Sequence, residues 1–247
     1  MTLLVALKGK NGLALAADSR GTFGDPRGVT AQNDSQEKAH ILAPHVAVLL
    51  AGSGEVGTLI VRKAAEAIKQ EQLDGVTAVM ERLRQTARDS YQSWFPSLPP
   101  IPAPQSVLSG QAAGRPDLAF VVAGYELGQQ GEATEAKLYQ LVSGTDFSPM
   151  LHDYGFAVCG VAQYALYLLN RLYEPDRTVQ ELTPLAAYVI TETASQDGKV
   201  GGPVRVIVVD PEDGCRALNP SDVDGVLKDN GVRSKTLRDS FYERGPS

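Results

Sequence analysis

The chain has 247 residues, of which 43% are hydrophobic, and this is enough for one large globular domain with a sizeable core. Its 23 basic and 29 acidic side chains give a formal net charge of −6, and no basic block or basic helix face stands out. Since nucleic-acid binding depends on such basic surfaces, nucleic acid is not expected as the main partner.

The cysteines, histidines and hydropathy exclude further classes of protein. Cys159 and Cys215 are far apart and neither belongs to a CxxC pair, so the sequence predicts neither a disulfide framework nor a zinc site. The three histidines show no HExxH spacing, which disfavours a metallopeptidase. No run of about 18 apolar residues occurs, and the first residues lack a signal-peptide pattern. We therefore expect a cytoplasmic protein with no metal, no organic cofactor and no membrane partner.

Short apolar runs and turn signals alternate in the first part of the chain, which is typical of β-hairpins. An Asn11-Gly12 turn separates the first two runs, and Pro44 lies between the next two. The polar, glycine-containing residues 18–35 between the two hairpins are predicted to form a loop. Four strands are thus expected before the first helix, at 2–7, 13–17, 40–42 and 46–51.

Pairs of helices then alternate with further strands. Apolar spacing predicts helices at 55–72 and from 76 to about 87, and later at 162–173 and 185–193. Thr183 is expected to cap the last of these, with Pro184 at its first helical position. Further strands are expected at 118–125, 137–142, 204–209 and 215–218. This order predicts an α+β fold, a four-layer αββα sandwich of two antiparallel sheets flanked by helix pairs.

One domain, residues 1–247, accounts for this element order. The segment 94–117 holds six of the fifteen prolines and no periodicity, and strands resume directly after it. It is therefore interpreted as an insertion rather than a linker between domains. The residues from about 221 to 247 form a charged C-terminal tail.

Thr2 is a candidate nucleophile, because removal of Met1 would expose its α-amine beside its own hydroxyl. An α-amine has an ordinary pKa of about 7.7–8.0 and can accept the hydroxyl proton. Alone, a threonine at position two is more often a coincidence. The context favours chemistry, because Asp18 and Lys38 lie at the ends of neighbouring predicted strands, and Gly52 offers an unobstructed N–H for an oxyanion.

At these residues the chain resembles the proteasome β-subunit family of N-terminal nucleophile (Ntn) hydrolases, which includes bacterial HslV-like peptidases. The resemblance rests on four segments in the family's order, namely Thr2-Leu-Leu-Val-Ala-Leu-Lys, Leu-Ala-Leu-Ala-Ala-Asp18-Ser19-Arg20, Lys38 and Ala51-Gly52-Ser53-Gly54. It implies an Ntn-hydrolase fold and a threonine peptidase. In that reaction Thr2 attacks the peptide carbonyl, Gly52 receives the oxyanion, and an acyl-enzyme ester forms. Lys38 would lower the amine pKa and Asp18 would hold Lys38.

Toward the C-terminus the chain departs from the family. The Asp-x-x-Ser that the family has near the end of its fourth helix is matched by Glu192-Thr-Ala-Ser195, which makes Glu192 and Ser195 candidate catalytic residues. The serine that the family has before its third helix is absent, and either Cys159 or Gly160 stands in its place. Between Arg20 and Lys38 the chain is a few residues longer than the family.

The resemblance also implies a substrate site and partners. An extended peptide or unfolded protein would pair with backbone near Thr22, and the first specificity pocket would be formed by Gly21, His40, Leu50 and Gly54. Self-assembly into rings or ring-like oligomers is expected, with an ATPase unfoldase as a further candidate partner. Two alternatives stay open, namely an Ntn hydrolase of small amides and a non-catalytic scaffold subunit.

Overall fold

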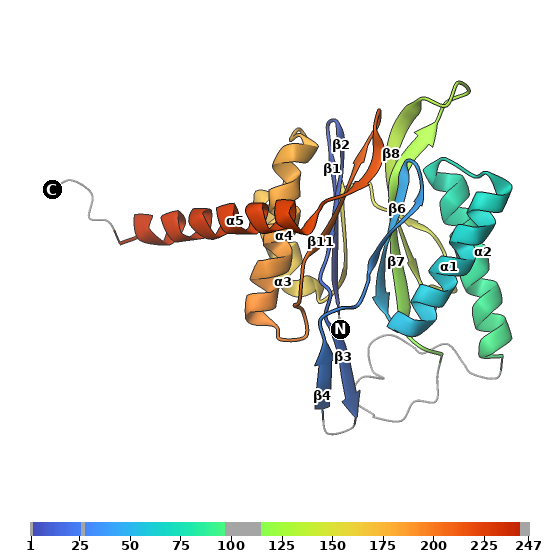
Figure 1. Cartoon of the computed structure of the whole chain (residues 1–247), viewed down its shortest axis with the longest axis horizontal. Coiled ribbons are helices and arrows are strands. Elements are labelled where there is room, and N and C mark those ends of the chain that lie inside the picture. Colours follow the sequence, from blue (N-terminus) through green and yellow to red (C-terminus); the bar gives the residue numbers. More distant parts are fainter. Residues whose placement is uncertain (1, 26–27, 97–114, 243–247) are drawn as a thin grey trace.

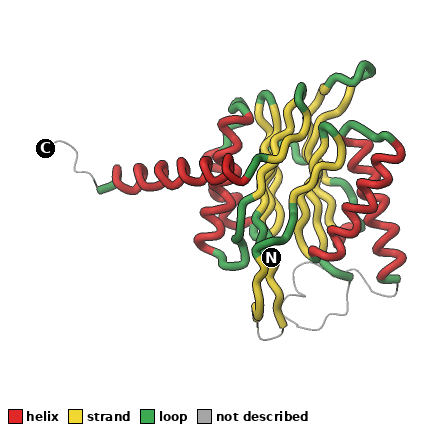
Figure 2. Tube along the Cα trace, in the orientation of Figure 1, coloured by secondary structure: helices red, strands yellow, loops and turns green. Residues whose placement is uncertain are grey.

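The computed structural model describes residues 2–25, 28–96 and 115–242, and its elements form four layers (Figures 1 and 2). The first sheet has the order β10-β1-β2-β11-β12 and the second has the order β5-β6-β7-β8-β9, with every pair antiparallel. Helices α3 and α4 cover the first sheet, and α1 and α2 cover the second. The predicted αββα sandwich of two antiparallel sheets is confirmed.

The strands of the first sheet are β1 (Leu3–Gly9), β2 (Gly12–Ala17), β10 (Phe156–Gly160), β11 (Arg205–Asp210) and β12 (Gly214–Ala217). Those of the second are β5 (Ala39–Ala43), β6 (Val46–Gly52), β7 (Leu118–Leu127), β8 (Ala133–Val142) and β9 (Met150–Leu151). The helices are α1 (Gly54–Glu71), α2 (Val76–Trp94), α3 (Ala162–Leu172), α4 (Val179–Gln196) and α5 (Pro220–Ser240), with a 3₁₀ turn at Ser143–Thr145.

Strand alternation divides the core into three parts. In β1, Leu4 and Ala6 point into the layer between the sheets, while Leu3, Val5 and Leu7 point toward α3 and α4. A third core lies between the second sheet and the helices α1 and α2. Because β1 is buried on both faces, its almost continuous apolar sequence follows from its central position.

The hairpins β1–β2, β5–β6 and β11–β12 and the helices α1, α2 and α3 confirm the corresponding predictions. The predicted loop 18–35 is wrong, because it contains the antiparallel strands β3 (Gly21–Asp25) and β4 (Gly28–Asn33). Six strands rather than four therefore precede α1. The β3–β4 ribbon extends away from the body, and its sequence lacks the apolar alternation that signals a strand (Figure 1).

The start of α4 also differs from the prediction. The helix begins at Val179, and its N-cap is Thr178, whose side chain forms a capping box with Glu181. Pro184 lies inside the helix, and the Thr183 hydroxyl donates to the Val179 carbonyl at 2.8 Å instead of capping a new helix. The charged C-terminal segment contains the helix α5, and the proline-rich segment 94–117 falls outside the described residues at 97–114.

Candidate active site

Thr2 lies directly before β1 at the end of the sandwich from which the β3–β4 ribbon extends. Its residue is only 5% exposed, and its carbonyl accepts a hydrogen bond from Val161 N at 2.8 Å. Thr2 also lines a cavity of about 700 Å³ that is bordered by the β3 end of the ribbon and the first turns of α1. The backbone of Thr2 is therefore fixed while the residue faces a space large enough for a peptide side chain.

Asp18 and Lys38 form a buried ion pair beside the first strand. Asp18 follows β2 and is 0% exposed, and Lys38 precedes β5 and is 1% exposed. The Lys38 Nζ donates to Asp18 Oδ1 at 2.8 Å and to the Arg20 carbonyl at 2.7 Å. The same Asp18 oxygen accepts from Leu3 N at 3.0 Å, which places the pair next to the residue that follows Thr2.

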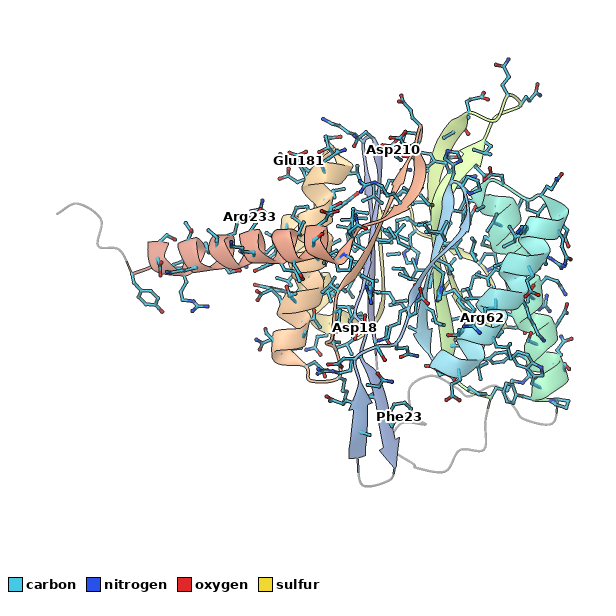
Figure 3. The ribbon with its side chains drawn as sticks, in the orientation of Figure 1. Asp18, Phe23, Arg62, Glu181, Asp210 and Arg233 are labelled. Atoms are coloured by element: carbon cyan, nitrogen blue, oxygen red, sulfur yellow. The ribbon has the colours of Figure 1, made fainter. Side chains whose placement is uncertain are left out.

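The second oxygen of Asp18 is also satisfied, since Oδ2 accepts from Arg20 N at 3.2 Å and from Gly201 N at 3.1 Å. Four donors thus hold this carboxylate. Burial lowers the pKa of Lys38 below its ordinary value, and the neighbouring Asp18 opposes that shift. An ammonium with a lowered pKa beside the first strand is a feature typical of catalytic sites. Figure 3 shows Asp18 inside the body, above the ribbon that carries Phe23.

Gly52 at the end of β6 has the geometry of an oxyanion donor. Its φ is +100°, and a Cβ at this position would overlap the Asp117 carbonyl, so only glycine fits. In the same strand Leu50 N donates to the Lys38 carbonyl at 2.8 Å, and N–H groups two residues apart point to the same edge. The N–H of Gly52 therefore points to the side of β6 on which β5 lies. The pairing of β5 with β6 begins at Ala39, opposite Leu49, so Gly52 lies past the paired part of β5.

Three of the predicted substrate-binding residues, Gly21, Thr22 and Gly54, line the cavity with Thr2 and Gly52. The side chain of Gln36 lies between the two glycines. A Cβ on Gly54 would overlap it, and a Cβ on Gly21 would lie 3.1 Å from its Oε1. The two glycines therefore make room for Gln36, which sequence reasoning missed.

His40 and Leu50 are not among the residues that line this cavity, contrary to the sequence-based expectation. Leu50 is 1% exposed and belongs to the core under α1, because the alternation of β6 points Val48 and Leu50 toward the helices. His40 is paired with Val48 and therefore shares that face of the sheet. The cavity also has a wall on this face, since Arg62 of α1 lines it and interacts electrostatically with His40, so a place for His40 and Leu50 near the first specificity pocket stays a prediction.

Neither Glu192 nor Ser195 is among the described residues that line the cavity. The Ser195 hydroxyl donates to the Glu192 carbonyl at 2.7 Å near the end of α4, and Gln196 Nε2 donates to Ser195 Oγ. Ser195 thus bonds within its own helix, as helix-end serines often do.

The geometry explains why the chain has no serine where the family has one before its third helix. Gly160 is paired with Leu3 and has a φ of +97°, and a Cβ there would overlap the Thr2 carbonyl, so no side chain fits. Cys159 is paired with Leu4 and packs against the core between the sheets, where burial raises its pKa to about 11. Neither residue places a hydroxyl beside Thr2.

Arg20 supports the site from outside. Its guanidinium forms a two-bond ion pair with Asp34 at 2.7 and 2.8 Å and donates to the Gly198 carbonyl at 3.0 Å. It lies against Gly201, where a Cβ would be 2.6 Å from the guanidinium carbon. Only Asp18-Ser19-Arg20 was singled out in the sequence, and the partners of the Arg20 guanidinium are at least 14 residues away along the chain.

Within the described part of the chain, no group of three or more His, Cys, Asp or Glu side chains could hold a metal ion. None of the helices in this described part combines the length and the hydropathy that a membrane-spanning helix needs.

Comparison with known proteins agrees with this geometry. Residues 2–95 match the family described as "Proteasome subunit". This part of the chain is proteasome-like. The match contains Thr2, Asp18, Lys38 and Gly52, and the resemblance to proteasome β-subunits predicted from the sequence is confirmed.

Two solved structures share the fold over its full length. Anbu from Hyphomicrobium sp. strain MC1, solved as a "(Gly-1) mutant", is 17% identical with a TM-score of 0.71, covering 100% of this chain and 99% of that protein. Anbu, "ancestral beta-subunit", from Yersinia bercovieri is 15% identical with a TM-score of 0.70, covering 99% of each chain. At these identities the likeness shows the fold, and the chain has the Ntn-hydrolase fold of these proteins.

Proposed function

We propose that this proteasome-like chain is a threonine peptidase in which Thr2, exposed by removal of Met1, hydrolyses peptide bonds. The observation that carries the proposal is the arrangement around Asp18. This carboxylate joins the N–H of Leu3 to the buried ammonium of Lys38, at 3.0 and 2.8 Å, beside a threonine that lines a cavity of about 700 Å³. A buried ion pair in this position serves the chemistry of Thr2 better than it serves stability, because desolvation offsets much of its Coulomb energy.

In the proposed reaction the free amine of Thr2 takes the proton of its own hydroxyl, directly or through water. The hydroxyl oxygen attacks the peptide carbonyl, and the N–H of Gly52 stabilises the oxyanion. The amine product leaves with the proton, and an ester between the acyl group and Thr2 remains. A water molecule activated by the amine hydrolyses this ester. The positive charge of Lys38 lowers the pKa of the amine, and Asp18 holds Lys38 in place.

An extended peptide substrate would lie along β3 near Gly21 and Thr22, with one side chain in the cavity beside Gly54. Gln36 would form one wall of that space. No metal or organic cofactor takes part in this reaction. The described residues that line the cavity do not include His40, Leu50, Glu192 or Ser195, so no role in this reaction is proposed for them.

The direct test combines the mass of the mature protein with covalent labelling by a peptide epoxyketone, which requires a hydroxyl and a free amine on one residue. We expect the active preparation to begin at Thr2 and to gain one label on its N-terminal peptide. Thr2→Ala should lose both label and peptide cleavage. The matched control is Thr134→Ala on β8, a threonine that does not line the cavity. Cleavage that survives in Thr2→Ala would overturn the assignment.

Two other functions compete with this one. A non-catalytic scaffold subunit is favoured by Gly160, which leaves no hydroxyl where the family has a serine. A hydrolase of small amides would use the same nucleophile on another substrate. Labelling without cleavage of any peptide would favour the small-amide reaction, and a preparation that keeps Met1 and takes no label would favour the scaffold.

The proposal includes a single Ntn-hydrolase domain over the whole chain, a cytoplasmic location and self-assembly into a ring or ring-like homo-oligomer. Such an assembly would restrict access to Thr2. An ATPase unfoldase is the partner that would deliver folded substrates to it. Light scattering at micromolar concentration tests the assembly, and a 26.3 kDa monomer with full peptidase activity would contradict it.

A further inference from the structure

One stripe of side chains runs along a single face of α5. Alternating steps of four and three residues join positions 223, 227, 230, 234, 237 and 241. The first half of the stripe packs on the body, where Val223 and Asn230 are buried and Leu227 is partly buried. Asn230 Nδ2 donates to the Pro184 carbonyl of α4 at 2.9 Å. The stripe is therefore a face that fits against α4.

The second half of the stripe has no such cover. Residues 231–242, which we call the arm, extend beyond α4 into solvent (Figure 1). In the arm Leu237, Phe241 and Tyr242 are 58%, 77% and 82% exposed. A helical segment of about ten residues is marginally stable alone in water, and exposed apolar side chains at its tip indicate a contact surface.

A groove of about 580 Å³ lies where α5 leaves α4. One wall is formed by Leu172 at the end of α3 and by Leu185 and Tyr188 of α4, and the other wall includes Leu237 of the arm itself. The groove continues the α4 surface on which Asn230 docks. It thus suits another copy of the same stripe. The arm of the same chain cannot fill it, because that arm is already one wall.

The arm and the segment next to one end of the groove have opposite net charges. Figure 3 shows Arg233 on α5 and Glu181 on α4. The arm carries three basic side chains and one acidic, namely Arg233, Lys235, Arg238 and Asp239. The segment 174–181 at one end of the groove carries three acidic side chains and one basic, namely Glu174, Asp176, Glu181 and Arg177. Arg177 and Glu181 of this segment line the groove, and Arg177 pairs with Glu174 and Glu181, so the segment forms a rim with a net negative charge beside the basic arm.

We infer that the occupant of the groove is the arm of a second copy of this chain, and that two copies exchange arms about a two-fold axis. Each groove then receives the same α5 stripe whose first half already packs on the neighbouring surface of α4 in its own chain. Each basic arm meets an acidic rim, and both exposed tips are covered in one closed contact. The contact is independent of the proposed reaction, since none of the described residues that line the Thr2 cavity belongs to α4 or α5.

The first experiment compares two aspartate variants of the full chain by sedimentation velocity at micromolar concentration. Leu237→Asp places a charge in the stripe, and we expect it to lose the species that depend on arm exchange. Val232→Asp is the matched control, because Val232 lies on the opposite face of the same arm and is 60% exposed. It should sediment like the unmodified chain. Equal effects of the two variants, or no effect of either, would overturn the inference.

The second experiment detects the contact directly. Phe241→Cys chains and Tyr188→Cys chains carrying different tags are mixed and oxidised. A disulfide between the two tags is expected, and it should be absent when the arm chain also carries Leu237→Asp. No disulfide between tags in folded protein, or a sedimentation pattern of monomers only, would refute arm exchange. Peptidase assays on the same samples separate this result from the proposed function, because Thr2 is unchanged in all of them.

Discussion

Replacing Lys38 with methionine should destabilise the protein strongly, because it leaves the buried Asp18 carboxylate without its counterion. Both side chains are at most 1% exposed, and their charged atoms are 2.8 Å apart. Removing one partner of such a pair costs about 3–5 kcal/mol. Three N–H groups, those of Leu3, Arg20 and Gly201, still donate to Asp18, so we expect the lower value of about 3 kcal/mol. In a chain of this size that lowers Tm by about 6–12 °C.

The assay is urea and thermal unfolding followed by circular dichroism, with Lys38→Met, Asp18→Asn and the double variant. The double variant removes both charges, so it should cost clearly less than the sum of the single changes. The exposed Lys10→Met serves as the control and should stay within about 0.5 kcal/mol of the unmodified protein. A loss below about 1 kcal/mol for Lys38→Met, or strict additivity in the double variant, would refute the reasoning.

Under the proposed mechanism Lys38→Met loses turnover as well. Activity must therefore be measured well below the Tm of the variant. Lys38→Arg should restore little activity, because a planar guanidinium does not replace the compact ammonium that donates to both Asp18 and the Arg20 carbonyl.

Three further changes test the geometry. Gly160→Ala places a Cβ against the Thr2 carbonyl and should cost about 2–4 kcal/mol in urea unfolding, whereas Gly131→Ala, with φ +84° and open space, should cost only about 1 kcal/mol of backbone strain. Thr178→Ala removes the capping box of α4 and should cost about 1 kcal/mol, with Tm as the measurement. Burial lowers the pKa of His40 below its unfolded value, so the unfolded state binds more protons and stability falls as pH drops below about 6.5. His40→Gln should flatten that part of the stability curve against pH, and an unchanged slope would contradict the burial argument.

The layers of the fold were predictable because the hairpins and helix pairs have strong local signals. Asn11-Gly12 marks the turn between β1 and β2, and the apolar spacing from Val76 to Ala87 marks the buried face of α2. The β3–β4 ribbon was missed because neither strand has an alternating apolar sequence. The start of α4 was missed because the Thr183-Pro184 pair was taken as a helix start, whereas the capping box is formed by Thr178 and Glu181.

Of the candidate site, only the residues at the ends of predicted strands could be predicted from the sequence. Asp18, Lys38 and Gly52 each lie next to a recognisable apolar run. Their proximity then follows from the packing of the two sheets against each other. His40 and Leu50 were expected in the pocket from the resemblance alone, because the side of a strand on which a residue lies depends on register. Gln36 could not be found from the sequence, since its role depends on two glycines on other segments.

The contacts of Asp18 show why this site depends on the whole fold. Its donors come from the start of β1, from the turn after β2, from the residue before β5 and from the loop before β11. A shift of any of these segments would move the carboxylate and with it the ammonium of Lys38. Gly160 adds a second constraint, because β10 approaches Thr2 so closely that no side chain fits between them. Under the proposed mechanism the proton relay is then left to the amine of Thr2 and to water entering from the cavity, since β10 contributes no hydroxyl there.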